Sequence, residues 1–509
     1  MLSMKNFALA ASIAVCGPFC IAAAPVSLPR STPESQGVSS SEVLGFVEKA
    51  DKTIDAMHSL IVVRHGHVVA EGWWAPYDAA SRHSLYSLSK SFTSTAIGLA
   101  VAEGKLSVDD RVLTFFPEDS PASPSDNLKA MRISDLLRMS TGHQNEPFLG
   151  PLLPESKTAS PANQPAWTKT FLAQPVPNKP GTHFLYNTPA TYMLSAIVQK
   201  TMGMTVLDYL KPRLFDPLGI EEPTWGTSPQ GISLGGYGLS VRTEDIAKFG
   251  QLYLQKGNWQ GAQLVPAAWI EAATARQTSN GSNPKSDWEQ GYGYQFWRCR
   301  NGAFRGDGAF GQYCIVLPEQ DAVIAITSSV KDMQAVLNLV WDQLLPALKP
   351  APLAADPKSS ETLERTLKGL SLRPQQGSGA SGVGAKVAGR VYRFPTNDRN
   401  LEAITLESDG KADAVTLVLK VDGVDHRIPC GRGEWRKGRL AYGQFSEQPA
   451  AVSGDWTADD TYTAKISFFE TPFLLTIHLK FTKDQLLFDS ESNVAFGPAQ
   501  KPQLVGKAD

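Results

Sequence analysis

The chain has 509 residues, of which 42% are hydrophobic and 19% charged, with 48 basic and 50 acidic side chains. This composition is that of a globular protein with enough chain for two to four domains of roughly 150 residues, and it excludes a chain that is disordered as a whole. The net charge of -2 provides no basic field for phosphate backbones, so we expect no nucleic-acid partner.

The first predicted element is an apolar N-terminal segment. Lys5 precedes an apolar run, Phe7 to Ala24, which Gly17 and Pro18 interrupt and which ends in three alanines. A basic start, a short apolar region and a small-residue end are typical of a secretory signal peptide. We therefore expect residues 1–24 to be removed on export, the mature protein to be periplasmic or secreted, and no membrane span to remain in it.

Residues 25–349 are predicted to form an α/β (α+β) domain. Ser59 to Ala70 alternates apolar and polar residues around a turn at Gly66, which is typical of a β-hairpin. Helical patterns follow, strands return between Tyr292 and Thr327, and a helix from Met333 to Leu348 closes the unit. Strands at both ends of a helical middle predict one antiparallel sheet flanked by helices, with a helical subdomain inserted.

A change of composition separates this domain from the rest of the chain. Residues 350–386 are rich in Pro, Ala, Ser and Gly, which predicts a linker. Beyond it, segments such as Ala414 to Val421 and Tyr462 to Phe469 alternate with Gly, Asp and Asn turns. Residues 387–509 are therefore predicted to form an antiparallel all-β domain, a small barrel. Its role stays open between capping a cleft, binding a ligand and stabilising the first domain.

Three cysteines follow the predicted signal peptide, which is too few for a fold built on disulfides. Cys299 and Cys314 flank a turn-rich stretch. They either pair across a hairpin in an oxidising compartment or, like Cys430, are small buried hydrophobic residues.

Ser87 and Lys90 are the leading candidates for chemistry. Nucleophilic serine chemistry needs a hydroxyl, a base to take its proton, and donors for the oxyanion that forms. Residues three apart on a helix share a face, so these two side chains are expected side by side in a first turn. The residues up to Glu103 are small and apolar enough to bury this helix, and an unpaired lysine there would be costly. The same spacing recurs where no buried helix begins, at Ser282 and Lys285, Ser328 and Lys331, and Ser408 and Lys411.

The heptapeptide Tyr-Ser-Leu-Ser-Lys-Ser-Phe at residues 86–92 resembles the active-site helix of the serine β-lactamase and penicillin-recognising superfamily. It is most similar to the class C-like serine hydrolases, which include esterases, D-peptidases and 6-aminohexanoate-dimer hydrolases. Residues 133–142, 180–188 and 236–249 resemble later family segments in the same order. The resemblance spans about residues 30–348, and it implies a β-lactamase/transpeptidase-like fold and a hydrolase without cofactor or metal.

The resemblance also implies roles for matching residues. Ser87 would be the acylated nucleophile, and Lys90 and Tyr186 would handle its proton, with the general base open between those two. The N–H groups of Ser87 and Ala309 would form the oxyanion hole, in which each donor is typically worth roughly a hundred- to thousandfold in rate. Thr188 stands where the family has Asn, with Asn187 one place earlier, and Thr188 is expected to bind substrate.

A second departure concerns the family's Lys-Thr-Gly element, which falls on Gly306, Asp307 and Gly308. These three residues are expected to bind substrate, but none is a cation that would hold a substrate carboxylate. The departure disfavours penicillins and D-Ala-D-Ala peptides and favours esters or uncharged amides. The two glycines fit a strand edge that passes close to a substrate, or an ordinary hairpin turn.

Other motifs are weaker. Ser125 to Asn127 spells the S-D-N element of class A relatives, but it lies in a Pro- and Ser-rich loop. Ser233 lies in a G-x-S-x-G pattern that lacks the preceding strand and following helix of an α/β-hydrolase. His65 and His67 have the spacing of a metal pair, but a hairpin turn places them on the surface without other ligands.

The sequence thus predicts an exported, cofactor-free serine hydrolase that acts on a small-molecule ester or amide through a Ser87 acyl-enzyme. Two alternatives remain: a D-aminopeptidase or amidase, and a catalytically silent penicillin-recognising sensor or binding module. Whether the protein has a partner protein stays open.

Overall fold

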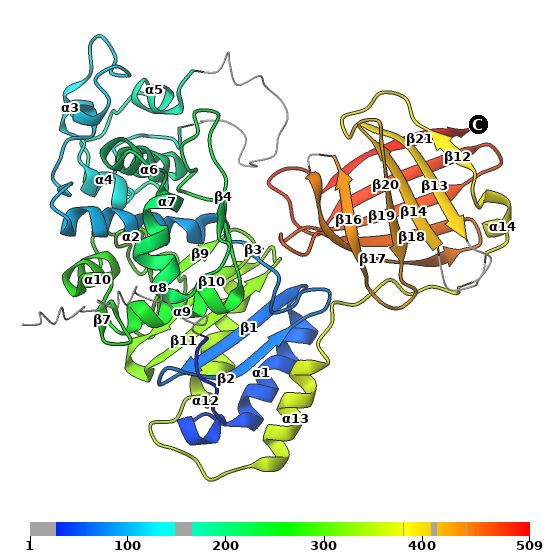
Figure 1. Ribbon diagram of the computed structural model, residues 1–509, viewed down its shortest axis with the longest axis horizontal. Helices are drawn as coiled ribbons and strands as arrows, with labels where there is room; N and C mark the ends of the chain where they lie inside the picture. The colour runs from blue at the N-terminus through cyan, green and yellow to red at the C-terminus, as the bar shows by residue number, and fades with distance from the viewer. Residues whose placement is uncertain (1–26, 148–164, 380, 409–414, 444) are drawn as a thin grey trace, which may run out of the picture.

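The computed structural model describes residues 27–147, 165–379, 381–408, 415–443 and 445–509. The predicted signal peptide, residues 1–24, lies outside these ranges. The chain folds into a helix-and-sheet domain followed by a barrel-like domain (Figure 1). Within the described ranges, no helix is long and apolar enough to cross a bilayer.

A six-stranded antiparallel sheet forms the centre of the first domain. Its order from edge to edge is β2 (His67–Trp73), β1 (Met57–Arg64), β11 (Ala322–Ser328), β10 (Gln312–Leu317), β9 (Phe304–Gly308) and β8 (Trp297–Arg298). Strands β1 and β11 pair with Ile61 opposite Ala325, so the two ends of the domain meet in one sheet. This pairing and the β1–β2 hairpin confirm the predicted architecture. The return of strands begins later than expected, because Tyr292 makes only isolated bridges.

Both faces of this sheet are buried. Leu60 and Val62 of β1 enter one core and Ile61 and Val63 enter the other, which explains why the central part of the strand is apolar.

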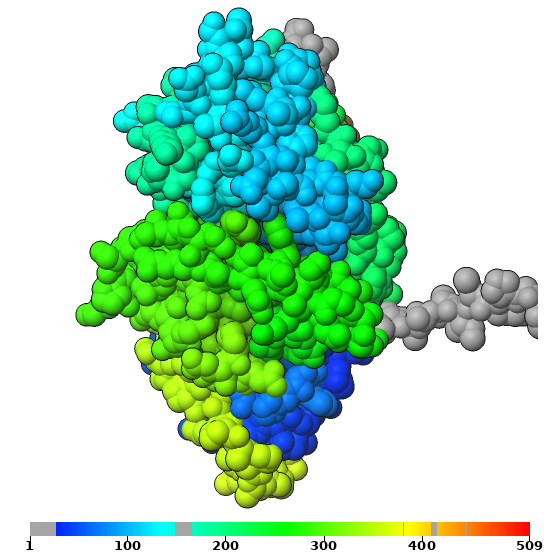
Figure 2. Space-filling view, turned by 90° about the vertical axis from the view of Figure 1, so that its left-hand side faces the viewer, coloured from blue at the N-terminus to red at the C-terminus, as the bar shows by residue number. Residues whose placement is uncertain are grey.

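The α-helices of the first domain are α1 (Ser40–Thr53), α2 (Ser89–Ala102), α3 (Asp126–Ala130), α4 (Ile133–Leu137), α5 (Trp167–Leu172), α6 (Thr188–Met202), α7 (Val206–Leu210), α8 (Asp216–Leu218), α9 (Thr243–Leu254), α10 (Ala267–Thr274), α11 (Met333–Leu339) and α12 (Leu345–Ala347). Two small sheets join β3 (His83–Ser84), β5 (Leu239–Val241) and β4 (Thr224–Trp225), and β6 (Asn258–Trp259) with β7 (Ala262–Gln263). Figure 2 shows the helical insert, in cyan, at the opposite end from the earliest and latest parts of this domain, in blue and yellow.

The segment predicted as a linker contains a helix, α13 (Pro357–Lys368). The Asp356 carboxylate caps it by accepting from the Ser359 N–H at 3.1 Å, and a proline occupies its first turn. Leu363 and Leu367, one turn apart, pack into the core beneath the sheet. The prediction missed this short amphipathic helix because it rested on the Pro, Ala, Ser and Gly content of the whole segment. A second short helix, α14 (Gly384–Val387), precedes the barrel.

The C-terminal domain is a ten-stranded antiparallel sheet. Its order is β15 (Val424–Cys430), β14 (Val415–Val421), β13 (Leu401–Ser408), β12 (Val391–Arg393), β21 (Gln500–Ala508), β20 (Gln485–Ser492), β19 (Leu474–Phe481), β18 (Thr461–Ser467), β17 (Phe445–Ala458) and β16 (Arg436–Tyr442). The two edge strands, β15 and β16, contact each other, so the sheet curls into a nearly closed barrel. This confirms the predicted all-β, barrel-like fold.

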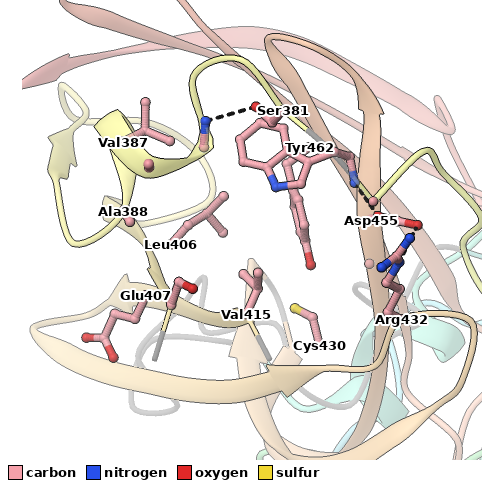
Figure 3. Close-up of a pocket in the computed structure, with 16 residues that line it drawn as sticks. Ser381, Val387, Ala388, Leu406, Glu407, Val415, Cys430, Arg432, Asp455 and Tyr462 are labelled. Carbon is pink, nitrogen blue, oxygen red and sulfur yellow. Dashed lines mark hydrogen bonds and ion pairs between the residues drawn. The ribbon is translucent and has the colours of Figure 1, made fainter. Parts of the chain in front are cut away.

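A cavity of about 490 Å³ lies at the end of the barrel where β17 ends and β18 begins (Figure 3). Leu406, Val415 and Tyr462 line it, and an ion pair of 3.4 Å joins Arg432 to Asp455 beside it. The other end of the barrel faces the first domain.

The structure decides between a disulfide and two unpaired residues for Cys299 and Cys314. Cys299 and Cys314 are unpaired and lie in separate cores, Cys314 with α2 and α9 and Cys299 with α1. Cys430 is also free and buried, in the barrel. All three are therefore small buried residues, and the Cys299 sulfur also accepts a hydrogen bond from Arg305 at 3.0 Å.

Candidate active site

Ser87 lies in a single 3-10 turn, Tyr86–Leu88, directly before α2. Tyr86 has a φ of 46°, a left-handed conformation that costs a residue with a side chain about 1–3 kcal/mol and that tends to occur at functional sites. Lys90 follows in the first turn of α2, and its Nζ lies 3.0 Å from the Ser87 Oγ. The helical spacing thus brings hydroxyl and amine together, as the sequence predicts.

The Lys90 side chain is buried and has three polar neighbours. It is 1% exposed, and its Nζ donates to the Gly236 carbonyl at 2.9 Å and to the Thr188 Oγ1 at 3.3 Å, besides its contact with Ser87. Burial lowers the pKa of Lys90 to about 7, and the negative charges of Glu146 and Asp307 oppose this shift only in part. The Lys90 amine therefore loses its proton much more readily than an ordinary lysine.

Tyr186 completes this group from the segment before α6. The Lys90 Nζ lies 4.9 Å from the centre of the Tyr186 ring, which stacks on Trp297 at 5.3 Å. Burial raises the pKa of Tyr186 well above its ordinary value, the negative charge of Asp307 adds to the rise, and a hydrogen bond with Ser87 offsets part of it. The phenol therefore keeps its proton at neutral pH.

The first family departure has a structural explanation. Asn187 is fully buried and caps α6, with its Oδ1 accepting from the Ala190 N–H at 3.0 Å. Its amide nitrogen donates to the Thr141 hydroxyl at 3.2 Å, so this side chain serves the helix. Thr188 instead lines the cleft and provides the hydroxyl that accepts from Lys90.

Gly236 is a participant that residue types do not reveal, because it acts through its backbone carbonyl. A Cβ at this position would lie 2.7 Å from the Thr188 Cγ2 and 3.5 Å from the Lys90 Nζ. A side chain at this position would therefore push against Thr188, which also contacts the Lys90 amine. The resemblance of residues 236–249 to a family segment is the one sequence signal that points to it.

The strand β9 runs directly past the nucleophile, so the glycine pair belongs to a strand and not to a hairpin turn. A Cβ on Gly308 would lie 2.0 Å from the Leu85 carbonyl oxygen and 3.2 Å from the Ser87 nitrogen. Gly306 faces the start of α2, where a Cβ would meet the Leu88 Cδ1 at 2.4 Å. Gly308 therefore borders the cleft, whereas Gly306 packs against Leu88 and is not among the residues that line the cavity; its predicted role in substrate binding stays a prediction.

Asp307 is held by a cation that the sequence reading overlooked. The Arg305 side chain is fully buried, and its Nε and Nη2 both lie 2.8 Å from the Asp307 Oδ2. Arg305 also donates to the Asp287 carbonyl at 2.8 Å, and its guanidinium lies 4.6 Å from the centre of the Trp288 ring. Because this cation is paired and enclosed, it offers no open site for a substrate carboxylate.

The assembled residues border one cavity of about 430 Å³. Ser87, Tyr186, Thr188, Asp307, Gly308 and Ala309 line it, so most of the predicted site residues are brought together. Its other lining is largely aromatic, from Tyr86, Tyr237, Trp288, Trp297 and Phe496. Phe496 comes from the barrel domain, more than 400 residues after Ser87, and no local pattern indicates its place here.

The alternative serines lie elsewhere. Ser125 caps α3, its Oγ accepting from the Leu128 N–H at 3.2 Å. Ser233 is buried, and its carbonyl accepts from the Ser195 hydroxyl at 2.7 Å. In the described part of the chain, no group of three or more His, Cys, Asp or Glu residues is arranged to hold a metal ion.

Comparisons with known proteins identify the family and the fold of the first domain. The sequence model of the β-lactamase family matches residues 50–348. The chain is 27% identical over 288 residues to 6-aminohexanoate-dimer hydrolase from Paenarthrobacter ureafaciens, covering 54% of this chain and 73% of that protein. It is 28% identical over 153 residues to lovastatin esterase from Penicillium rubens, covering 27% of this chain and 38% of the esterase. The solved structure of EstCE1, a hydrolase with promiscuous acyltransferase activity, superposes with a TM-score of 0.50 at 16% identity, covering 61% of this chain and 99% of EstCE1.

Proposed function

This chain belongs to the β-lactamase family, and from that premise we propose that it is a serine hydrolase that cleaves an ester or amide through an acyl-enzyme on Ser87. The observation that carries the proposal is the contact between the Ser87 hydroxyl and a buried amine whose pKa lies near 7. Relatives named as a 6-aminohexanoate-dimer hydrolase and a lovastatin esterase support the reaction class.

The hydrogen bonds of Lys90 favour it as the general base. A neutral amine has two N–H donors and one lone pair. The Gly236 carbonyl can only accept, and the Thr188 hydroxyl lies within reach of the second N–H. The lone pair is then left for the third neighbour, the Ser87 hydroxyl, whose proton it takes as Oγ attacks the substrate carbonyl.

Tyr186 is better suited to donate a proton. Because its pKa is raised, it is a neutral phenol at the pH at which Lys90 becomes a base. In the proposed acylation step, the bond from Ser87 Oγ to the carbonyl carbon forms and the bond to the leaving group breaks. The leaving group takes a proton from the protonated Lys90, directly or through Tyr186. Water then attacks the carbonyl carbon of the acyl-enzyme and gives a proton to the same pair. The bond from that carbon to Ser87 Oγ breaks, Ser87 takes the proton back from the pair, and the acid is released.

The oxyanion of both steps would lie between the N–H groups of Ser87 and Ala309. Support comes from the close passage of β9, because the Gly308 backbone next to Ala309 packs directly against the Ser87 turn. Two fixed donors of this kind stabilise the charge that develops in the transition state.

The charges around the cleft bear on the substrate. Glu146 and Asp307 are both carboxylates in the lining, and the cation nearest to Asp307 is already paired with it. A substrate carboxylate would meet repulsion here, so the proposal is an ester or amide without one beside the scissile bond.

Covalent labelling tests the proposal. A fluorophosphonate should modify the purified protein stoichiometrically, and Ser87→Ala should remove the label together with hydrolysis of p-nitrophenyl acetate. Ser282→Ala is the matched control, because that exposed serine has the same Ser-x-x-Lys spacing, and it should leave both signals intact. An unlabelled wild-type protein would support the silent binding module. Comparison of p-nitrophenyl esters with D-amino acid anilides separates an esterase from the amidase alternative.

A further inference from the structure

The barrel touches the first domain at the rim of the cleft. The Ser84 N–H, three residues before Ser87, donates to the Glu470 carbonyl at 2.8 Å. On the loop between β20 and β21, the Asn493 side chain accepts from the Leu474 N–H at 2.9 Å and donates to the Ser329 hydroxyl. Asn493 thus anchors this loop both to the barrel and to the first domain.

Four aromatic rings form the centre of this contact, two from each domain. Tyr86 and Phe310 belong to the first domain, and their ring centres lie 5.7 Å apart. Phe496 of the barrel lies 5.6 Å from Tyr86 and 4.7 Å from Phe310, and Phe473 lies 5.9 Å from Phe310. Tyr86 precedes Ser87, and Phe310 follows Ala309. The barrel therefore packs on the immediate neighbours of both proposed oxyanion donors.

Phe496 differs from the rest of this aromatic cluster in its exposure. Its side chain is 49% exposed, whereas Tyr86 and Phe473 are buried at 8% and 5%. Phe496 lines the cavity that contains Ser87, and it also lines a second cavity of about 360 Å³ formed by residues of the barrel. An aromatic ring that is fixed along one edge and open toward a cavity offers apolar area to a ligand at little cost in conformational entropy.

The two sides of the cleft differ in chemistry. The leaving group must take a proton, so it has to lie toward Lys90 and Tyr186, and Tyr186 is stacked on Trp297. The acyl group would then occupy the remaining side of the carbonyl, and Phe496 and Tyr86 are part of the lining available to it.

We propose that Phe496 of the barrel forms a wall of the acyl-binding site and makes the enzyme selective for substrates with a bulky apolar acyl group. The proposal rests on the proposed function, since it needs an acyl-enzyme at Ser87. It assigns the barrel a part in substrate recognition, because without the barrel the acyl site lacks this wall.

The test compares p-nitrophenyl hexanoate with p-nitrophenyl acetate as substrates of the full chain. Wild type should have the higher kcat/KM for hexanoate. Phe496→Ala should lower the ratio of kcat/KM for hexanoate to kcat/KM for acetate about tenfold, as expected when an apolar contact in a pocket is lost. Phe496→Leu keeps an apolar wall and should retain most of the hexanoate activity. Phe394→Ala is the matched control, because this partly buried barrel phenylalanine packs on Phe488 and does not line the cleft.

The outcomes separate the two proposals. An unchanged ratio of hexanoate to acetate activity in Phe496→Ala, with normal fluorophosphonate labelling, overturns the role of Phe496 and leaves the hydrolase intact. A wild type that prefers acetate also overturns it. A wild type that neither hydrolyses esters nor takes the label overturns the proposed function, and the acyl site with it.

Discussion

Two segments of the first domain carry the same serine-x-x-lysine spacing in opposite surroundings. Ser87 and Lys90 begin a buried helix, where the amine has three polar neighbours and a pKa lowered to about 7. Ser282 and Lys285 lie in an exposed loop without helix or strand. The comparison teaches that the motif provides the groups and that burial provides the reactivity, since desolvation is what makes a lysine a base near neutral pH.

Replacing each of the two lysines in turn gives the strongest test of this difference between the two segments. Lys90→Met keeps the volume of the side chain but removes the base, and we expect kcat/KM for p-nitrophenyl acetate to fall by about 10²–10⁴. Lys285→Met should change it less than twofold. If Lys90→Met folds and its kcat/KM for p-nitrophenyl acetate falls by less than tenfold, the amine is not the base.

Adding a methyl group to β9 tests whether the activity depends on close packing around Ser87 as well as on the Ser-x-x-Lys motif. Gly308→Ala places a Cβ against the Leu85 carbonyl oxygen, so strand and serine turn must separate. A displacement of about 1 Å at a reacting group can cost about 10² in rate, and we expect that loss in kcat together with a lower melting temperature, because the added methyl group displaces packed backbone. Gly45→Ala is the control, because a Cβ there meets no atom within 4 Å and alanine favours the helix α1. Equal activity of the two variants would contradict the account.

Much of this arrangement follows from local patterns. The alternation of β1 and β2, the helical spacing of Ser87 and Lys90, and the turn-separated strands of the barrel are properties of short segments. Each was predicted because one period of side chains, near two or near 3.6 residues, decides which face is buried.

The rest depends on contacts between distant segments. The Gly236 carbonyl is a backbone group, which leaves no trace in residue type. The pairing of Arg305 with Asp307 depends on burial that a two-residue spacing does not show. Phe496 reaches the cleft only because the barrel packs on Tyr86 and Phe310. In each case the deciding fact is a tertiary neighbour.

The pH dependence of Ser87 labelling tests the central claim most directly, since it needs no knowledge of the substrate. If the proton of Ser87 passes to Lys90, the rate of fluorophosphonate labelling should rise with pH as the amine loses its charge, with a midpoint near pH 7. The rate at pH 6 should be about one tenth of its value above pH 8, and the raised pKa of Tyr186 should add no second change below pH 10. A midpoint above pH 9, as for an ordinary lysine, or a rate independent of pH would contradict the account.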